Sequence, residues 1–370
     1  MRTGSLLLQR ESLCQKRFHV VVLTYFGAIL QIFHATLSAW TRQGTNNTLP
    51  IRIQRFSLGS AHCARPEGTT MKARQALCRS SCSFRLLSSS STTTSATLHT
   101  EHVGDNQSTI FLHGLLGNGK NLKTMAQRMG GGHLVDLRGH GNSQGSHFSE
   151  PHSFVACADD VEQTFETNPP KVIVGHSFGG RVALEATAAR TNHHNNDSSA
   201  TTTTWLLDTV PGQAHDSVLQ VLHAVASMDL SAVKNKKDVV HTLETTYGVE
   251  PSIGQWLASS MSKSQEGDIL QWGFDVELVQ QLMPHFATQD FFGLVEQACT
   301  TTDATTMHLV RGGRNQGWAT DPMLLPQLEK LQKTLPNFYV HVLPKAGHWV
   351  HVDDLPGLLQ LWNQHQQQQQ

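Results

Sequence analysis

Residues 171–180 read KVIVGHSFGG and carry the strongest structural signal in the chain. The first four are rich in β-branched side chains, which favour a strand, and the following stretch Arg181–Arg190 is typical of a helix. Between them stands the pattern G-x-S-x-G, in which Gly175 and Gly179 leave room for a sharp turn. Such a turn would hold Ser177 on a strained corner with its hydroxyl exposed, as a nucleophile requires.

On both sides of this segment, short apolar runs alternate with stretches of helical length. This alternation predicts an α/β fold with a parallel sheet. The expected strands are Thr109–Leu112, His133–Leu137, Lys171–Val174, Trp205–Leu207, Met307–Val310 and Phe338–Leu343. The expected helices between them include Asn121–Met129, Ser153–Glu166, Phe178–Arg190 and Leu324–Thr334.

One long segment, about residues 214–290, interrupts the alternation with helical patterns only. Its expected helices are Val218–Met228, Asp238–Thr246, Ile253–Met261 and Val276–Met283. Because the segment stands between two expected sheet strands, it can form a cap over the carboxyl edge of the sheet. Open α/β sheets bind their ligands at that edge.

The ends of the chain differ in composition from the domain expected over residues 98–365. Residues 1–97 read as a targeting leader, largely disordered: an apolar run from Phe18 to Trp40 follows several basic residues, and the rest is basic, Ser-rich and poor in acids. We expect an organellar protein, with the mitochondrion favoured if translation starts at Met71. A bipartite plastid leader and a membrane anchor over residues 18–40 are the alternatives. Residues 366–370 read as a disordered poly-Gln tail, and Thr191–Thr204 as a surface insertion.

The charges nearly cancel, with 28 Lys and Arg against 29 Asp and Glu. No strong field therefore exists to attract nucleic acid. Four of the six cysteines fall in the first quarter of the chain, so we expect no structural disulfide. No metal, nucleotide or flavin motif is visible, and the sequence leaves the oligomeric state open.

A serine nucleophile needs a base and donors for the oxyanion that forms on the attacked carbonyl. His348 follows the last expected strand on a Gly-His loop, which can reach across the carboxyl edge, so we favour it over His341 and His351. The backbone N–H groups of Leu115 and Phe178 are the expected oxyanion donors. His113, which begins the HGLLG turn after the first expected strand, is interpreted as a packing residue.

These motifs together resemble the α/β-hydrolase superfamily from about Leu98 to Trp362. Further stretches look like the group containing the mitochondrial α/β hydrolase domain-containing protein eleven and the bacterial YbfF-type esterases: VDLRGHGNS at 135–143, LDTVP at 207–211, WGFD at 272–275 and VRGGRN at 310–315. The resemblance implies a mostly parallel central sheet flanked by helices, with the helical cap inserted between the sixth and seventh strands. It also implies a cofactor-free serine hydrolase.

The resemblance leaves the acid of the catalytic triad open. Most members of the superfamily place it after the penultimate strand, but here that loop reads RGGRNQG at 311–317 and contains no carboxylate. Asp208, at the end of the strand next to the nucleophile strand, is the preferred replacement. Asp275 is the alternative acid, although Asp is also a common helix N-cap. Asp303 and Asp321 rank behind both.

The expected function is hydrolysis of carboxylic ester or thioester bonds in small to medium acyl substrates. The partner is thus a small-molecule acyl ester or thioester, and the mature domain is expected to contain no stable membrane span. Three alternatives stay open at the level of sequence: a catalytically weak scaffold that binds proteins, an acyltransferase, and a C–C hydrolase. The last two use the same three side-chain types.

Overall fold

The structure is a computed structural model that describes residues 96–145, 147–193, 201–264, 269–300 and 305–368. The chain divides into two units, Met1–Arg85 and Leu86–Gln370, and every described residue belongs to the second. The predicted leader therefore lies outside the described residues, apart from Ala96 and Thr97. Its targeting role stays a prediction.

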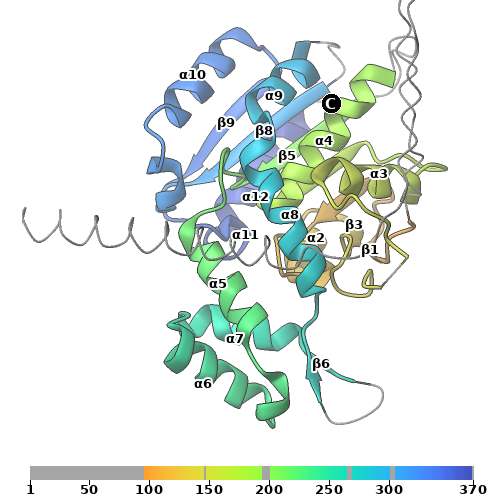
Figure 1. The fold of residues 1–370 in the computed structure, drawn as a ribbon. Coiled ribbons are helices and arrows are strands. Elements are labelled where there is room, and N and C mark those ends of the chain that lie inside the picture. The colour runs from red at the N-terminus through yellow and green to blue at the C-terminus, as the bar shows by residue number, and fades with distance from the viewer. Residues whose placement is uncertain (1–95, 146, 194–200, 265–268, 301–304, 369–370) are drawn as a thin grey trace, which may run out of the picture. The chain divides into compact units, whose positions relative to one another are not determined.

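The second unit is built on a seven-stranded sheet in the order β1-β3-β2-β4-β5-β8-β9 (Figure 1). Only β1 runs antiparallel to its neighbour, and the other paired strands of this sheet are parallel. The mostly parallel sheet predicted from the sequence is thus confirmed. The strands are β1 (Thr100–Gly104), β2 (Thr109–Leu112), β3 (Gly131–Val135), β4 (Val172–His176), β5 (Thr202–Leu207), β8 (Thr305–Gly312) and β9 (Phe338–Leu343).

Central strands of a parallel sheet are covered on both faces, which explains why they read as continuous apolar runs. Every residue of β2 and of β5 is buried. The strand β1 is different, because only Val103 is buried in it. This edge strand was missing from the sequence prediction, since a half-exposed strand with one buried side chain has no continuous apolar run.

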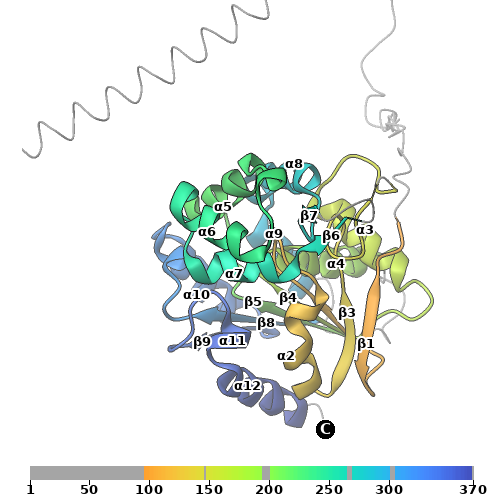
Figure 2. The same ribbon diagram turned by 90° about the horizontal axis from the view of Figure 1, so that it is seen from below.

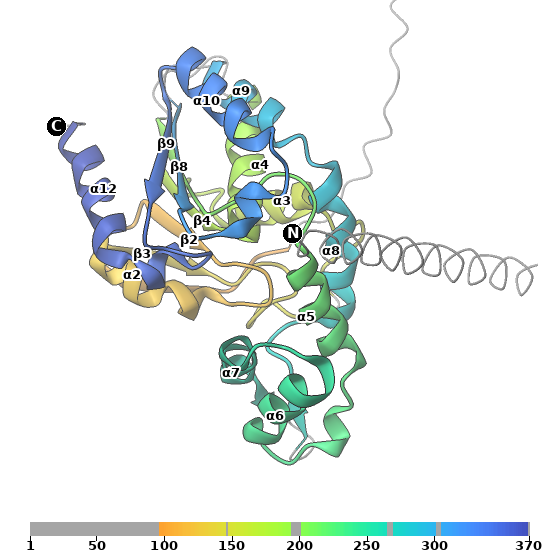
Figure 3. The same cartoon turned by 90° about the vertical axis from the view of Figure 1, so that its left-hand side faces the viewer.

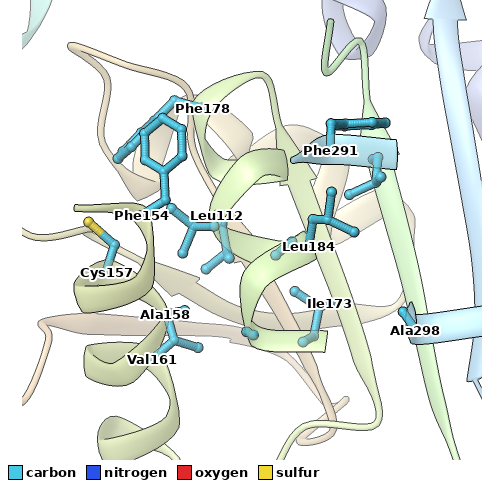
Figure 4. Close-up of a cluster of buried hydrophobic side chains, with 14 of the residues drawn as sticks. Leu112, Phe154, Cys157, Ala158, Val161, Ile173, Phe178, Leu184, Phe291 and Ala298 are labelled. Carbon is cyan, nitrogen blue, oxygen red and sulfur yellow. The ribbon is translucent and has the colours of Figure 1, made fainter. Parts of the chain in front are cut away.

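Helices cover both faces of the sheet. On one face α3, α4, α9 and α10 enclose a core that includes Phe154, Phe178 and Leu112 (Figure 4). On the other face α2, α11 and α12 enclose a second core (Figure 2). The flanking helices are α2 (Lys123–Arg128), α3 (Phe154–Thr164), α4 (Phe178–His193), α9 (Phe291–Thr300), α10 (Leu324–Thr334), α11 (Val350–Asp353) and α12 (Leu355–Gln368), with 3-10 turns η1 (Gly119–Leu122) and η3 (Gln316–Ala319).

The chain leaves the sheet after β5 to form a helical cap and returns at β8 (Figure 3). The cap has its own apolar core, to which Leu116 from the loop after β2 also contributes. Its elements are α5 (Asp216–Ser227), η2 (Leu230–Ala232), α6 (Lys236–Tyr247), α7 (Pro251–Ser260), β6 (Ser262–Lys263), β7 (Leu270–Gln271) and α8 (Val276–Thr288). In chain order it follows the fifth strand of the main sheet, not the sixth as the resemblance implied, because the described sheet has β1 to β5 before the cap.

Two sequence assignments need correction. The C-terminal tail was predicted to be disordered from residue 366, but α12 continues to Gln368. Its buried residues Leu358 and Trp362 hold the helix on the sheet, and glutamine propagates a helix well. The polar insertion was predicted over Thr191–Thr204, yet Thr202–Thr204 form the buried start of β5. Residues 194–200 lie outside the described part.

Strand register brings the ends of four strands to one edge. His176 of β4 pairs with Leu207 of β5, and Leu207 pairs with Val310 of β8. Gly312 of β8 pairs in turn with Leu343 of β9. The residues that directly follow these strands are therefore neighbours at the carboxyl edge. Within the described ranges, no helix has both the length and the apolar content needed to cross a membrane.

Candidate active site

Ser177 occupies the corner between β4 and α4 in a left-handed backbone conformation, with φ of 52°. Such a φ is strained for a residue with a side chain and is held by its surroundings. The Ser177 amide donates to the Leu207 carbonyl at 2.9 Å, and the Ser177 carbonyl accepts from Gly180 and Arg181 at 3.0 and 3.2 Å. Hydrogen bonds to both its amide and its carbonyl therefore fix the backbone of Ser177. The residue is half-buried, so part of it remains accessible to solvent.

The two glycines of the motif are required by close backbone packing. A Cβ on Gly175 would lie 2.3 Å from the Gly179 carbonyl oxygen, and one on Gly179 would lie 2.3 Å from the Leu112 carbonyl oxygen. Phe178, between Ser177 and Gly179, anchors the turn by placing its fully buried ring in the core (Figure 4). The spacing G-x-S-x-G thus serves the geometry that the sequence suggested.

His348 lies on the loop between β9 and α11, and its Nδ1 hydrogen-bonds Asp208 Oδ2 at 2.8 Å. Asp208 is fully buried, whereas 39% of the His348 side chain is exposed. Because His348 Nδ1 faces the Asp208 carboxylate, which accepts hydrogen bonds, the neutral imidazole carries its proton on Nδ1. The lone pair of Nε2 is then available to act as a base. Within the described chain, Nε2 has no protein partner.

His176 links the loop that carries His348 to the strand–helix corner that carries Ser177. Its Nε2–H donates to the His348 carbonyl at 3.0 Å, and the two imidazole rings lie 4.9 Å apart. A Cβ on Gly114 would lie 2.9 Å from His176 Nδ1, so the ring also fills the space beside the loop after β2. Burial, together with nearby His351, lowers the pKa of His176 well below its usual value, which keeps the ring neutral.

The two aspartates left open by the sequence occupy different surroundings. Asp208 directly follows β5, contacts His348, and accepts further hydrogen bonds from Gly312, Asn315 and Trp318. Asp275 is the N-cap of α8 and accepts from the Leu278 amide at 3.1 Å.

Of the two lower-ranked aspartates, only Asp321 belongs to the described residues, and it is not paired with His348. Asp321 is exposed and accepts from the Met323 amide at 2.8 Å. Asp303 lies outside the described residues.

The expected oxyanion donors are Leu115, in the loop after β2, and Phe178, the first residue of α4. Across the described residues, neither the Leu115 amide nor the Phe178 amide donates to another protein group. The neighbouring Leu116 has a left-handed backbone with φ of 63°, and its amide donates to His140 Nε2 at 3.1 Å. This hydrogen bond holds Leu116 in its left-handed conformation and so fixes the turn that carries Leu115.

His113 and His140 brace this turn rather than face a substrate. His113 Nε2 accepts from the Leu137 amide at 3.0 Å while Nδ1–H donates to the Gly114 carbonyl at 2.8 Å. His140 Nδ1–H likewise donates to the Arg138 carbonyl at 2.9 Å. Burial lowers the pKa of His113 to about 4 and that of His140 to about 3. Both rings are therefore neutral at physiological pH, in keeping with a packing role.

Among the described residues, neither of the two histidines that competed with His348 in the sequence is hydrogen-bonded to Asp208. His341 Nε2 pairs with His308 Nδ1 at 3.0 Å, within a partly buried row of stacked aromatic rings. His351 is buried against the edge of the His176 ring, and burial lowers its pKa to about 4.

Three residues of this site were not singled out from the sequence: His176, Asn315 and Trp318. His176 is the residue between Gly175 and Ser177 in the G-x-S-x-G motif, so the motif itself was the signal for its position. Asn315 belongs to the loop that lacks a carboxylate, and its hydrogen-bonding side chain was the available signal. In the described portion of the chain, no group of three or more His, Cys, Asp or Glu side chains is arranged to hold a metal ion.

A serine at a strained strand–helix corner, with a His–Asp pair at the same edge of a parallel sheet, defines a class of proteins with a nucleophile elbow. In agreement, residues 109–358 match the model of the alpha/beta hydrolase family. The chain belongs to this family.

Within this family, the chain is similar to several proteins of known activity. The sn-1-specific diacylglycerol lipase ABHD11 of Danio rerio is 25% identical over 266 residues, which cover 68% of this chain and 75% of the relative. Esterase YbfF of Escherichia coli is 22% identical over 259 residues, covering 67% and 89%. A marine microorganism esterase of known structure aligns with a TM-score of 0.56 at 19% identity, over 72% of this chain and 97% of that one. The relatives are esterases and lipases, which supports hydrolase activity.

Proposed function

We propose that this protein is a serine hydrolase that cleaves carboxylic ester or thioester bonds of small to medium acyl substrates through an acyl-enzyme. The observation that carries the proposal is the hydrogen bond from His348 Nδ1 to Asp208. The loop that holds His348 is itself hydrogen-bonded to His176, the residue before Ser177. The bond to Asp208 orients an imidazole whose Nε2 is free to take a proton. The named activities of the relatives support the same class of reaction.

In the proposed mechanism Ser177 Oγ attacks the acyl carbonyl carbon while His348 Nε2 accepts its proton. Asp208 holds the ring and stabilises the imidazolium that forms. The Leu115 and Phe178 amides donate to the oxyanion, an effect typically worth about 3 kcal/mol per donor. The imidazolium then protonates the leaving alcohol or thiol, and water deprotonated by the same nitrogen releases the acid and restores Ser177.

The test is active-site titration of the full chain with a fluorophosphonate probe, followed by hydrolysis of p-nitrophenyl esters of increasing acyl length and of an acyl-thioester. Wild type is expected to be labelled once and to turn over, whereas Ser177→Ala is expected to lose both properties. A control, Ser217→Ala, changes an exposed serine at the start of α5 and should behave as wild type. Absence of labelling in folded wild type would favour the scaffold alternative.

The acyltransferase alternative is separated by the fate of the acyl group. Both reactions pass through the same acyl-serine, which is resolved either by water or by an alcohol. Adding ethanol to the assay and measuring free acid against ethyl ester reports the partition. Hydrolysis predicts that free acid dominates at low ethanol concentration, whereas dominant ester formation would contradict the proposal.

A further inference from the structure

The strongest feature beyond the three proposed catalytic side chains is the loop after β8, residues 313–318. We propose that Asn315 and Trp318 in this loop are positioning residues that set the orientation and the basicity of Asp208. The loop itself contains no carboxylate over residues 311–317. The inference rests on the proposed serine hydrolase function.

Asp208 has hydrogen-bond donors on both of its oxygens. Oδ1 accepts from the Gly312 amide at 2.8 Å and from Trp318 Nε1 at 2.7 Å. Oδ2 accepts from Asn315 Nδ2 and, at 2.8 Å, from His348 Nδ1. With two donors on each oxygen of a fully buried group, the plane of the carboxylate is fixed. Only one of these four donors, His348, can carry a positive charge.

The orientation of Asn315 is determined by its second hydrogen bond. Asn315 is the N-cap of η3, and its Oδ1 accepts from the Gly317 amide at 2.9 Å. The amide nitrogen must therefore face Asp208. Trp318 lies within the same short helix with only 2% of its surface exposed, so packing holds its indole N–H toward the same carboxylate.

The same loop is bound to the segment that carries His348. The Gly313 amide donates to the Leu343 carbonyl and the Arg314 amide to the Ala346 carbonyl, both at 2.9 Å. A Cβ on Gly312 would lie 2.0 Å from the Gly347 carbonyl oxygen, so the two backbones touch. The loop after β8 therefore contacts both Asp208 and the segment that leads to His348, and it helps to position the two residues relative to each other.

The chemistry explains an amide at position 315. A carboxylate there would meet the Asp208 carboxylate directly, and two carboxylates in contact cannot both stay ionised. An asparagine instead donates to Asp208 and leaves its negative charge for the imidazole. Neutral donors also disperse that charge. Removing one should make Asp208 more basic, so that His348 is protonated more readily and is available as a base only at higher pH.

The test compares Trp318→Phe and Asn315→Ser with Trp205→Phe. Serine preserves an N-cap oxygen for η3 but lacks the amide donor. Trp205 is the matched control, because it is fully buried on β5, the strand that leads to Asp208, and its Nε1 has no partner among the described residues. The measurements are kcat and KM for a p-nitrophenyl ester, the pH profile of kcat/KM, and fluorophosphonate labelling.

Both test variants are expected to lower kcat by about 10- to 100-fold, the loss typical of one hydrogen bond to a charged group. KM should stay nearly constant, and the acid limb of kcat/KM should move to higher pH. Trp205→Phe should leave the limb in place. The inference is overturned if both test variants keep the wild-type kcat and limb, or if Trp205→Phe shifts the limb equally. Failure of the proposed function is a separate result, seen as unlabelled wild type.

Discussion

Asp208 and Asp275, the two candidate acids from the sequence, have different roles in the structure. Asp208 is buried and hydrogen-bonded to His348, while Asp275 caps α8 through the Leu278 amide. One carboxylate therefore orients a proposed base, and the other satisfies a helix terminus. Their substitutions should affect different measurable quantities.

We predict that Asp208→Asn lowers kcat by about 10³- to 10⁴-fold, because the imidazole loses the partner that fixes its tautomer. Asp275→Ala should keep kcat within a few-fold of wild type and reduce the free energy of unfolding by about 1 kcal/mol through loss of the cap. Ester turnover and urea denaturation check the pair. Loss of turnover in Asp275→Ala with retention in Asp208→Asn would reverse the assignment.

Among the secondary-structure elements, β4 and α4 fix the position of Ser177 through their close approach to each other and to the loop after β2. The contacts are between backbones, so a side chain cannot swing away to relieve a clash. Gly175 meets the Gly179 carbonyl, and Gly179 meets the carbonyl at the end of β2. An added methyl group must therefore move the corner that carries the hydroxyl.

Gly175→Ala is predicted to destabilise the protein by about 1 to 3 kcal/mol, since the added Cβ would lie 2.3 Å from a carbonyl oxygen. It should also lower kcat of the folded fraction by about 100-fold, because small displacements of a nucleophile are costly. The matched control is Gly254→Ala in α7, where the nearest atom would lie 3.5 Å away. That change should stabilise the protein by about 0.4 to 1 kcal/mol.

Thermal unfolding and kcat of the folded protein distinguish these two glycine variants. Wild-type turnover by Gly175→Ala would show that the corner tolerates a side chain and that its glycine spacing is not a packing requirement.

At the scale of the whole molecule, several buried histidines link stability to pH. Burial lowers the pKa of His113 to about 4, of His140 to about 3 and of His351 to about 4. In the unfolded chain a histidine has a pKa of about 6.5. Between these values the unfolded state binds more protons than the folded state. The stabilising effect of the neutral rings is therefore full above about pH 6.5 and is lost as the pH falls toward the folded values.

We predict that the free energy of unfolding falls from pH 7 to pH 5, by about 1 to 2 kcal/mol for each of these three histidines. Urea denaturation at the two pH values measures the difference. His351→Phe is the informative variant, because His351 Nδ1 has no partner in the described structure and an apolar ring can replace it. Its pH dependence should be smaller by the share of one histidine. An unchanged slope would mean that His351 does not contribute.

The elements that could be predicted from the sequence are those whose signals are local. The strands Thr109–Leu112 and Phe338–Leu343 and the helix Leu324–Thr334 have the bounds that their patterns predicted. The corner at Ser177 was also visible, because glycine spacing and β-branched residues act over a few positions. The edge strand β1 and the helical end of α12 were missed, since packing against distant parts of the chain stabilises them.

Which aspartate faces His348 depends on contacts between distant parts of the chain and could not be read from local patterns. Asp208 and His348 lie 140 positions apart, and the cap separates β5 from β8 in sequence although these strands are hydrogen-bonded neighbours. That adjacency brings Asn315 and Trp318 onto Asp208. Local patterns report side-chain periodicity and backbone preference, whereas strand order follows from burying both faces of one sheet at once, and that condition involves the whole domain.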